Sequence, residues 1–292
     1  MGARIEGDWR QIAGNPDLGA YTTAEQQPVD FAVWQASDGR WQLWSCIRHT
    51  ACGGQTRLLY RWESADLHAS DWKPMGIAME ADPHFGETPG GLQAPHVIRE
   101  EGVYHMFYGD WARICLASSR DGKHFTRLLN DEGNPGLFSG PYGNTRDPMV
   151  LKVGARFYCY YMGHVEDKVP QSAVFCRTSV DLRMWSEPSM VAAGGIAAAQ
   201  TDWYGGDCEC PFVVQQGEGF VLFRTQRYGQ SNQTTLYRSP DPLDFGIDDD
   251  RYRIGTLPVA APEIIKQNDE MVIAALMPSL DGIRAARLSW SP

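Results

Sequence analysis

The 292-residue sequence lacks several features that define common classes of protein. No apolar stretch approaches the ~18 residues of a transmembrane helix. The best candidate, residues 191–199, is short and interrupted by Gly194 and Gly195. The first residues also lack the apolar core of a secretory leader. These absences predict no membrane partner and a cytoplasmic location, or secretion if a leader has been removed.

Runs of positive charge are missing too. The chain has 26 Lys and Arg against 36 Asp and Glu, which gives a net charge of −10. Nucleic acids and anionic membranes attract clustered positive charge, so neither is an expected partner, whereas a neutral sugar is compatible. The seven Cys form no C-x-x-C pair and show no metal-ligand spacing, so we expect neither a disulfide framework nor a zinc site. No G-x-S-x-G elbow or phosphate loop is present.

A repeated hairpin runs through the whole chain. Five segments begin with a small or acidic residue, in most cases followed by Pro, and continue as an apolar strand. They start at Asp30, Ala94, Asp147, Cys210 and Ala261. A polar turn such as Glu101-Gly102 follows each segment and leads to a second strand rich in aromatic and β-branched residues. This order is typical of a β-hairpin.

A third element recurs after the hairpins. It consists of Ser, Asp two residues later, and then an aromatic residue. The copies are Ser64/Asp66/Trp72, Ser119/Asp121/Phe125, Ser179/Asp181/Trp185 and Ser239/Asp241/Phe245. We expect Ser and Asp to cap a turn, and the aromatic side chain to pack between neighbouring units.

One small antiparallel sheet cannot bury both of its faces, so five such units must stack. Radial stacking leaves only short edges. We therefore predict an all-β fold, a single five-bladed β-propeller over residues 1–292 with blades starting near 30, 94, 147, 210 and 261. The N-terminal strand is expected to close the ring onto the fifth blade. Residues 191–201 are expected to be an inter-blade connection.

The first strand of each blade lines the central channel of a propeller, so the starts of these strands converge on one pocket. In chain order these positions are Asp30, Gln93 to His96, Arg146-Asp147, Glu209 and Glu263. Several carboxylates in a narrow cavity repel one another unless a function retains them. Glycoside cleavage needs such a group, because one carboxylic acid protonates the leaving oxygen while a second carboxylate acts on the anomeric carbon or on water.

These residues resemble the motifs of glycoside hydrolase families 43 and 32, which are related five-bladed propeller enzymes. The matching stretches are Pro28-Val29-Asp30, Gln93-Ala94-Pro95-His96, Arg146-Asp147-Pro148 and Glu209-Cys210-Pro211. The Arg-Asp-Pro and Glu-Cys forms are closer to family 32, the fructofuranosidases. The chain lacks that family's Trp-Met-Asn-Asp-Pro-Asn opening and C-terminal β-sandwich, and Gln93 replaces the usual Trp of family 43.

The resemblance implies a role for each matching residue. Glu209 would be the general acid, Asp30 the general base, and Asp147 a residue that holds sugar hydroxyls and tunes Glu209. Arg146 would fix the charge of Asp147 or bind the substrate. The implied activity is an exo-acting glycoside hydrolase on a pentofuranosyl, arabinofuranosyl-like or related sugar, with direct displacement.

Three alternatives remain open. One is a retaining, family 32-like β-fructofuranosidase with Asp30 as the nucleophile. Another is a non-catalytic propeller that binds glycan or protein; it predicts that Glu209 is held in a buried ion pair or lies too far from Asp30. The last is a transferase or phosphorylase, which an anion pocket of extra Arg or His residues near Asp30 would favour.

Further candidates for substrate binding lie in the channel and on its rim. The loops after the second strands carry His49, Asp110-Trp111, His164 and Gln226-Arg227. The predicted substrate-binding residues are Gln93, His96, Trp111, Arg146, His164, Trp203, Arg227 and Glu263. Trp rings stack on sugars, while Arg and His bind hydroxyls; packing between blades is the alternative role for each. No cofactor is required, and the resemblance allows a structural Ca²⁺ ion.

Overall fold

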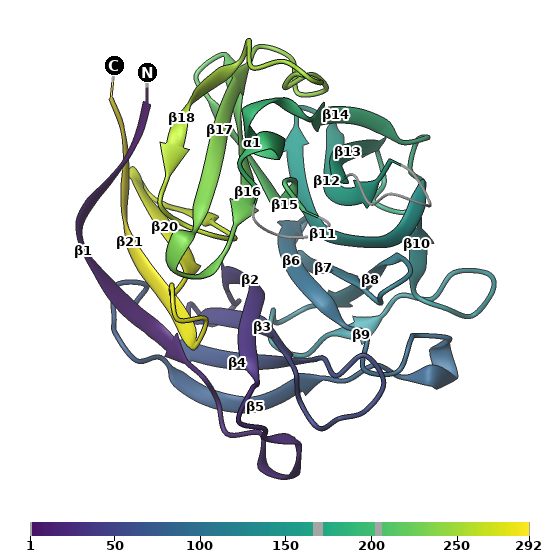
Figure 1. The fold of residues 1–292 in the computed structure, drawn as a ribbon. Coiled ribbons are helices and arrows are strands. Elements are labelled where there is room, and N and C mark those ends of the chain that lie inside the picture. Colours follow the sequence, from purple (N-terminus) through teal and green to yellow (C-terminus); the bar gives the residue numbers. More distant parts are fainter. Residues whose placement is uncertain (1, 166–171, 202–205, 292) are drawn as a thin grey trace.

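The computed structural model describes residues 2–165, 172–201 and 206–291. Within these residues the strands form five antiparallel sheets arranged around a central axis (Figure 1). Neighbouring first strands contact one another around that axis: β2 contacts β6, β6 contacts β11, β11 contacts β15, β15 contacts β19, and β19 contacts β2. The predicted all-β, five-bladed β-propeller is confirmed.

The blades use consecutive strands of the chain, running from the axis outward. The first blade contains β2 (Gln27–Gln35), β3 (Trp41–Arg48), β4 (Leu58–Ser64) and β5 (Lys73–Met79). The second contains β6 (Gln93–Glu100), β7 (Val103–Gly109), β8 (Ile114–Ser119) and β10 (Gly136–Phe138), with β9 (Thr126–Arg127) also paired to β8. The third contains β11 (Tyr142–Val153), β12 (Arg156–His164), β13 (Ser172–Ser179) and β14 (Ser189–Ala193). The fourth contains β15 (Glu209–Gln216), β16 (Gly219–Arg227), β17 (Gln233–Ser239) and β18 (Arg253–Leu257).

The fifth blade joins the two ends of the chain. Its three inner strands are β19 (Glu263–Gln267), β20 (Glu270–Leu276) and β21 (Gly282–Ser291), and its outer strand is β1 (Gly2–Gly14). β1 pairs antiparallel with β21, and the termini lie side by side in Figure 1. The Trp72 amide donates to the carbonyl of Ile12 at 2.8 Å, which connects this blade to the first.

Aromatic side chains fill the spaces between blades, as the recurring Ser/Asp/aromatic element predicts. Phe125 of the second blade packs edge-on against Trp44 of the first, with ring centroids 5.3 Å apart. Phe245 of the fourth blade packs against Tyr160 of the third at 6.2 Å. The large buried area of such rings makes these contacts a major source of stability.

Residues 191–201 differ in part from the predicted connection. The first three of them continue β14, the outer strand of the third blade, because Val191, Ala192 and Ala193 are buried. A short helix, α1 (Gly195–Ala199), follows.

The 3₁₀ turns lie at Gly19–Tyr21, Pro83–Phe85 and Gly229–Ser231. In the described part of the chain no helix has the length and apolar character needed to cross a membrane.

Candidate active site

A backbone irregularity recurs at the start of each first strand. One non-glycine residue per blade has a positive φ: 35° at Asp30, 39° at Ala94, 59° at Asp147, 45° at Cys210 and 48° at Ala261. The pairing with the second strand shifts register at this point in the first four blades. Such bulges redirect side chains and are common beside active sites. Here they turn residues of several blades toward one end of the channel.

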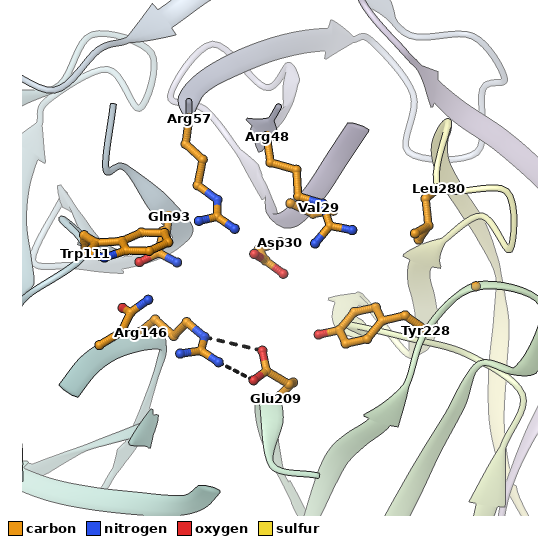
Figure 2. Close-up of a pocket in the computed structure, with 12 residues that line it drawn as sticks. Val29, Asp30, Arg48, Arg57, Gln93, Trp111, Arg146, Glu209, Tyr228 and Leu280 are labelled. Atoms are coloured by element: carbon orange, nitrogen blue, oxygen red, sulfur yellow. Dashed lines mark hydrogen bonds and ion pairs between the residues drawn. The ribbon is translucent and has the colours of Figure 1, made fainter. Parts of the chain in front are cut away.

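A cavity of about 490 Å³ occupies that end of the propeller. Figure 2 shows the side chains around it, with Asp30 of the first blade facing Glu209 of the fourth across the opening. The cavity is lined by Val29, Asp30, Arg48, Arg57, Gln93, Trp111, Asn144, Arg146, Glu209, Tyr228, Gly229 and Leu280. Oε1 of Gln93 and Oδ1 of Asn144 are buried without a hydrogen-bond partner among the described residues. Unpaired polar atoms of this kind are costly, and sugar hydroxyls could satisfy them.

Glu209 forms a buried ion pair with Arg146. Nη2 of Arg146 lies 2.5 Å from Oε1 of Glu209, and their side chains are 10% and 7% exposed. Burial raises the pKa of Glu209, Arg146 lowers it, and the nearby charge of Asp30 raises it again, with a net upward shift. The Arg146 pKa is also raised, because the carboxylates of Glu209 and Asp147 outweigh its burial.

Asp147 lies close to Asp30 and is itself buried. Its Oδ2 accepts a hydrogen bond from the Cys210 amide at 3.0 Å, while its Oδ1 is buried without a partner among the described residues. Burial, followed by the charges of Asp30 and Glu209, raises the pKa of Asp147 well above its usual value. A protonated Asp147 can therefore donate a hydrogen bond to a neighbouring carboxylate or to a sugar hydroxyl.

One cluster in the described residues has the spacing of a metal site. Its ligand atoms, from Asp30, Asp147 and Cys210, lie within 4.8 Å of one another. The thiol of Cys210 donates to Oδ1 of Asp30 at 3.2 Å, and burial raises its pKa well above the usual value. Ca²⁺ requires six to eight oxygen ligands. Two carboxylates beside a protonated thiol do not fit this ion, so no chemical step is derived from a metal.

The structure places the predicted substrate-binding residues in different environments. Gln93, Trp111 and Arg146 line the cavity. His96 lies in the channel wall, where Nε2 is 3.3 Å from the Val150 carbonyl and burial lowers its pKa to about 4. Glu263 lines a second, small cavity of about 20 Å³ deeper in the channel.

Three other rim candidates lie elsewhere or are not described. His164 pairs with Tyr142 across β11 and β12, and neither His164 nor Arg227 is among the residues that line the cavity. Trp203 lies outside the described residues.

Several lining residues were not predicted from the sequence, notably Arg48, Arg57, Asn144, Tyr228 and Leu280. The sequence predicts that residues after the second strands reach the site. In two of these places the neighbour of the predicted residue lines the cavity. Arg48 lines it in place of His49, and Tyr228 in place of Arg227. Side chains alternate along a strand, so an error of one residue selects the wrong face.

Sequence comparison gives one distant relative. No family model matches the chain. It is 26% identical over 196 residues to a probable sucrose-6-phosphate hydrolase of Psychromonas ingrahamii, a match that covers 58% of this chain. The chain spans about a third of the length of that relative.

Comparison of structures gives extensive matches at low identity. A thermostable family-43 glycoside hydrolase superposes with a TM-score of 0.67 at 18% identity, covering 92% of this chain and 91% of that one. An endo-arabinase from Bacteroides thetaiotaomicron gives 0.68 at 12% identity, with coverage of 95% and 98%. The chain is thus a five-bladed β-propeller with the fold of the family 43 glycoside hydrolases. Over part of its length it is also distantly similar in sequence to a probable sucrose-6-phosphate hydrolase.

Proposed function

We propose that this protein is a glycoside hydrolase that removes a terminal pentofuranosyl or related sugar. The observation that carries the proposal is the pair of carboxyl groups of Asp30 and Glu209, which face one cavity from different blades. Most glycoside hydrolases use such a pair of carboxyl groups, one on each side of the scissile bond. Trp111 and the unpaired amide oxygens of Gln93 and Asn144 supply a stacking surface and acceptors for a sugar ring.

The proposed reaction assigns one proton transfer to each carboxyl group. Protonated Glu209 donates its proton to the leaving oxygen as the glycosidic bond breaks. Asp30 takes a proton from the water whose oxygen forms the new bond to the anomeric carbon. The raised pKa of Glu209 favours the acid role, because the carboxyl stays protonated to a higher pH than an ordinary Glu.

The Arg146–Glu209 ion pair is the feature that a purely binding propeller predicts, so it specifically favours that second candidate function. In the hydrolase, a sugar hydroxyl that accepts the Arg146 hydrogen bonds would release Glu209 to hold a proton. Asp147, with its own raised pKa, supplies a neighbouring proton donor. The two candidates therefore differ in whether Glu209 transfers a proton, which an activity measurement decides.

The test is sugar release from aryl α-L-arabinofuranosides, aryl β-D-xylosides, sucrose and inulin by the wild type, Glu209→Gln and Asp30→Asn. Glu218→Gln is the matched control, because Glu218 is exposed in the hairpin turn of the same blade. We expect release by the wild type and the control, and a loss of roughly 10²–10⁴-fold in each site variant. Failure of the wild type to release sugar from any of them, together with measurable sugar binding, would support the binding propeller instead.

The stereochemistry distinguishes direct displacement from a covalent intermediate on Asp30. Proton NMR of the first product formed shows whether the anomeric configuration is inverted or retained. Inversion identifies Asp30 as the base, whereas retention, with transfer of the sugar to added methanol, identifies it as the nucleophile.

A further inference from the structure

The cavity carries an excess of positive charge that the proposed hydrolysis does not use. Its lining includes three guanidinium groups, from Arg48, Arg57 and Arg146, and two carboxylates, from Asp30 and Glu209. The whole chain has a net charge of −10, so this local excess is opposite in sign to the rest of the protein. Arg146 is paired with Glu209. The other two arginines account for the excess.

Arg57 has no anionic partner in the described part of the chain. Its Nε is buried without a hydrogen bond, and the side chain forms no ion pair there. The guanidinium carbon lies over the ring of Trp111, 4.8 Å from its centroid, a cation–π contact that restrains the side chain without neutralising its charge. A half-buried and uncompensated guanidinium is costly, and an anion would offset that cost.

Arg48 is held beside it by a neutral group. Its Nε and Nη2 donate to Oε1 of Gln27 at 2.9 and 2.7 Å, and Nη1 has no partner among the described residues. Figure 2 shows the Arg48 and Arg57 guanidinium groups pointing into the cavity near Asp30, with which neither forms an ion pair. Three other shielded arginines of the molecule do face carboxylates. The examples are Arg113 with Asp110, Arg127 with Glu87, and Arg224 with Asp207.

We propose that Arg48 and Arg57 form a subsite that binds a phosphate group on the first-blade side of the cavity. Two guanidinium groups converging on one space suit a doubly charged tetrahedral oxyanion, because each can donate two N–H bonds to it. A neutral hydroxyl would leave the net positive charge of Arg48, Arg57 and Asp30 uncompensated. The phosphate belongs either to the sugar itself or to free orthophosphate beside it. This inference rests on the proposed function only in taking the ligand that carries the phosphate to be a sugar. Phosphate binding itself requires no turnover.

The primary test is calorimetric titration with ribose 5-phosphate, inorganic phosphate and uncharged ribose at low ionic strength. Wild type, Arg48→Gln and Arg57→Gln are compared with Arg40→Gln, whose exposed side chain lies on the same blade and pairs with Glu63. We expect ribose 5-phosphate to bind at least about tenfold tighter than ribose. Arg48→Gln and Arg57→Gln should each weaken the binding of ribose 5-phosphate about tenfold or more and leave ribose binding unchanged. The control Arg40→Gln should bind both ligands as the wild type does.

Two results would overturn the subsite. One is equal affinity of the wild type for ribose 5-phosphate and ribose, and the other is an equal loss for both ligands in Arg57→Gln. The assay is repeated in Glu209→Gln, which should still bind phosphate. Phosphate binding by a wild type that releases no sugar would therefore support this inference even where the hydrolase proposal fails.

A product assay distinguishes the two sources of phosphate. An enzyme specific for a phosphorylated sugar should hydrolyse an aryl ribofuranoside 5-phosphate faster than the unphosphorylated glycoside. If orthophosphate is the ligand, its oxygen forms the bond to the anomeric carbon while the leaving oxygen takes the proton of Glu209. The product is then a sugar 1-phosphate instead of the free sugar, which ³¹P NMR detects.

Discussion

Buried carboxyl groups at the centre of the propeller differ in the cations that face them. Glu209 has Arg146 within 2.5 Å, and the opposing effects of burial and this pair leave its pKa raised. Among the described residues Glu263 has no such partner, and burial alone raises its pKa well above the usual value. The first environment suits a proton donor that must also ionise. The second favours a carboxyl group that stays neutral.

Replacing Glu263 with Gln should stabilise the protein at alkaline pH. A carboxyl whose pKa is higher in the folded state binds more protons folded than unfolded, so its contribution to stability falls as pH rises above the unfolded value of 4.5. Gln removes this loss. We expect the free energy of unfolding of Glu263→Gln to exceed that of the wild type by about 1 kcal/mol or more at pH 8, and to match it near pH 4.

Urea titrations at the two pH values measure this difference. A variant that is less stable than the wild type at both would show that ionised Glu263 makes a favourable contact, contrary to this account.

At the residue scale, the sequence predicted the carboxylates better than the cations. Asp30, Asp147 and Glu209 occupy equivalent or adjacent positions of a repeat, so the alignment of blades brings them together. Arg48 ends β3 and Arg57 directly precedes β4 of the first blade, and neither position belongs to the repeated motif. Their direction depends on strand alternation and loop conformation, which composition and spacing do not specify.

At the scale of elements, two loops hold Arg57 in place. Residues 49–57 connect β3 to β4 and pack against residues 88–91, which precede β6. The Arg57 amide donates to the Gly90 carbonyl at 2.8 Å, and the Gln55 amide to that of Pro89 at 2.9 Å. The backbones approach so closely that a Cβ on Gly54 would lie 2.0 Å from the Pro89 carbonyl oxygen. Only glycine fits this contact.

Gly54→Ala should therefore weaken phosphate binding at a site it does not touch. Gly53→Ala is its control: both glycines have positive φ, at 55° and 86°, but a Cβ on Gly53 meets nothing within 4 Å. Both variants carry the backbone strain, of roughly 1–3 kcal/mol, whereas only Gly54→Ala separates the loops. Calorimetry should show a loss of ribose 5-phosphate affinity in Gly54→Ala alone; equal losses in both would attribute the effect to strain.

The bulges of the first strands illustrate the limit of sequence reasoning about elements. The repeat located these positions, and the aligned residues at each blade start are the ones with positive φ. Four of the five are followed by Pro, which disfavours helical backbone in the residue before it. That preference does not specify a positive φ, so the direction in which the bulge turns each side chain required the structure.

At the scale of the whole molecule, the ring is closed by the pairing of the two termini. β1 and β21 form the outer half of the fifth blade, and Ile12 on β1 lies at its junction with the first blade, where the side chain is 1% exposed. The five-bladed ring was predictable because every blade repeats the same hairpin. The site follows from the ring, since closure sets the distance between the first and fourth blades.

Ile12→Ala should open this junction. Removing buried methyl groups from a packed core costs about 2–5 kcal/mol, and here the cavity would fall between the first and last blades. Ile77→Ala is the control, because Ile77 is 37% exposed on an outer strand. Urea unfolding should show a loss in the Ile12 variant several times that of the control. Equal losses would mean that the junction contributes no more than an ordinary surface position.

The central claim is that Glu209 protonates the leaving group. The most direct test is whether the loss of activity in Glu209→Gln depends on the acidity of the leaving group. The measurement is kcat/KM of wild type and Glu209→Gln on aryl glycosides whose phenols span a range of acidity. An acidic nitrophenol leaves without much protonation, while an unsubstituted phenol needs it. The account predicts a small loss in Glu209→Gln for the nitrophenyl substrate and a loss of roughly 10²–10⁴-fold for the phenyl substrate. An equal loss for every leaving group would contradict it and leave Glu209 as a structural partner of Arg146.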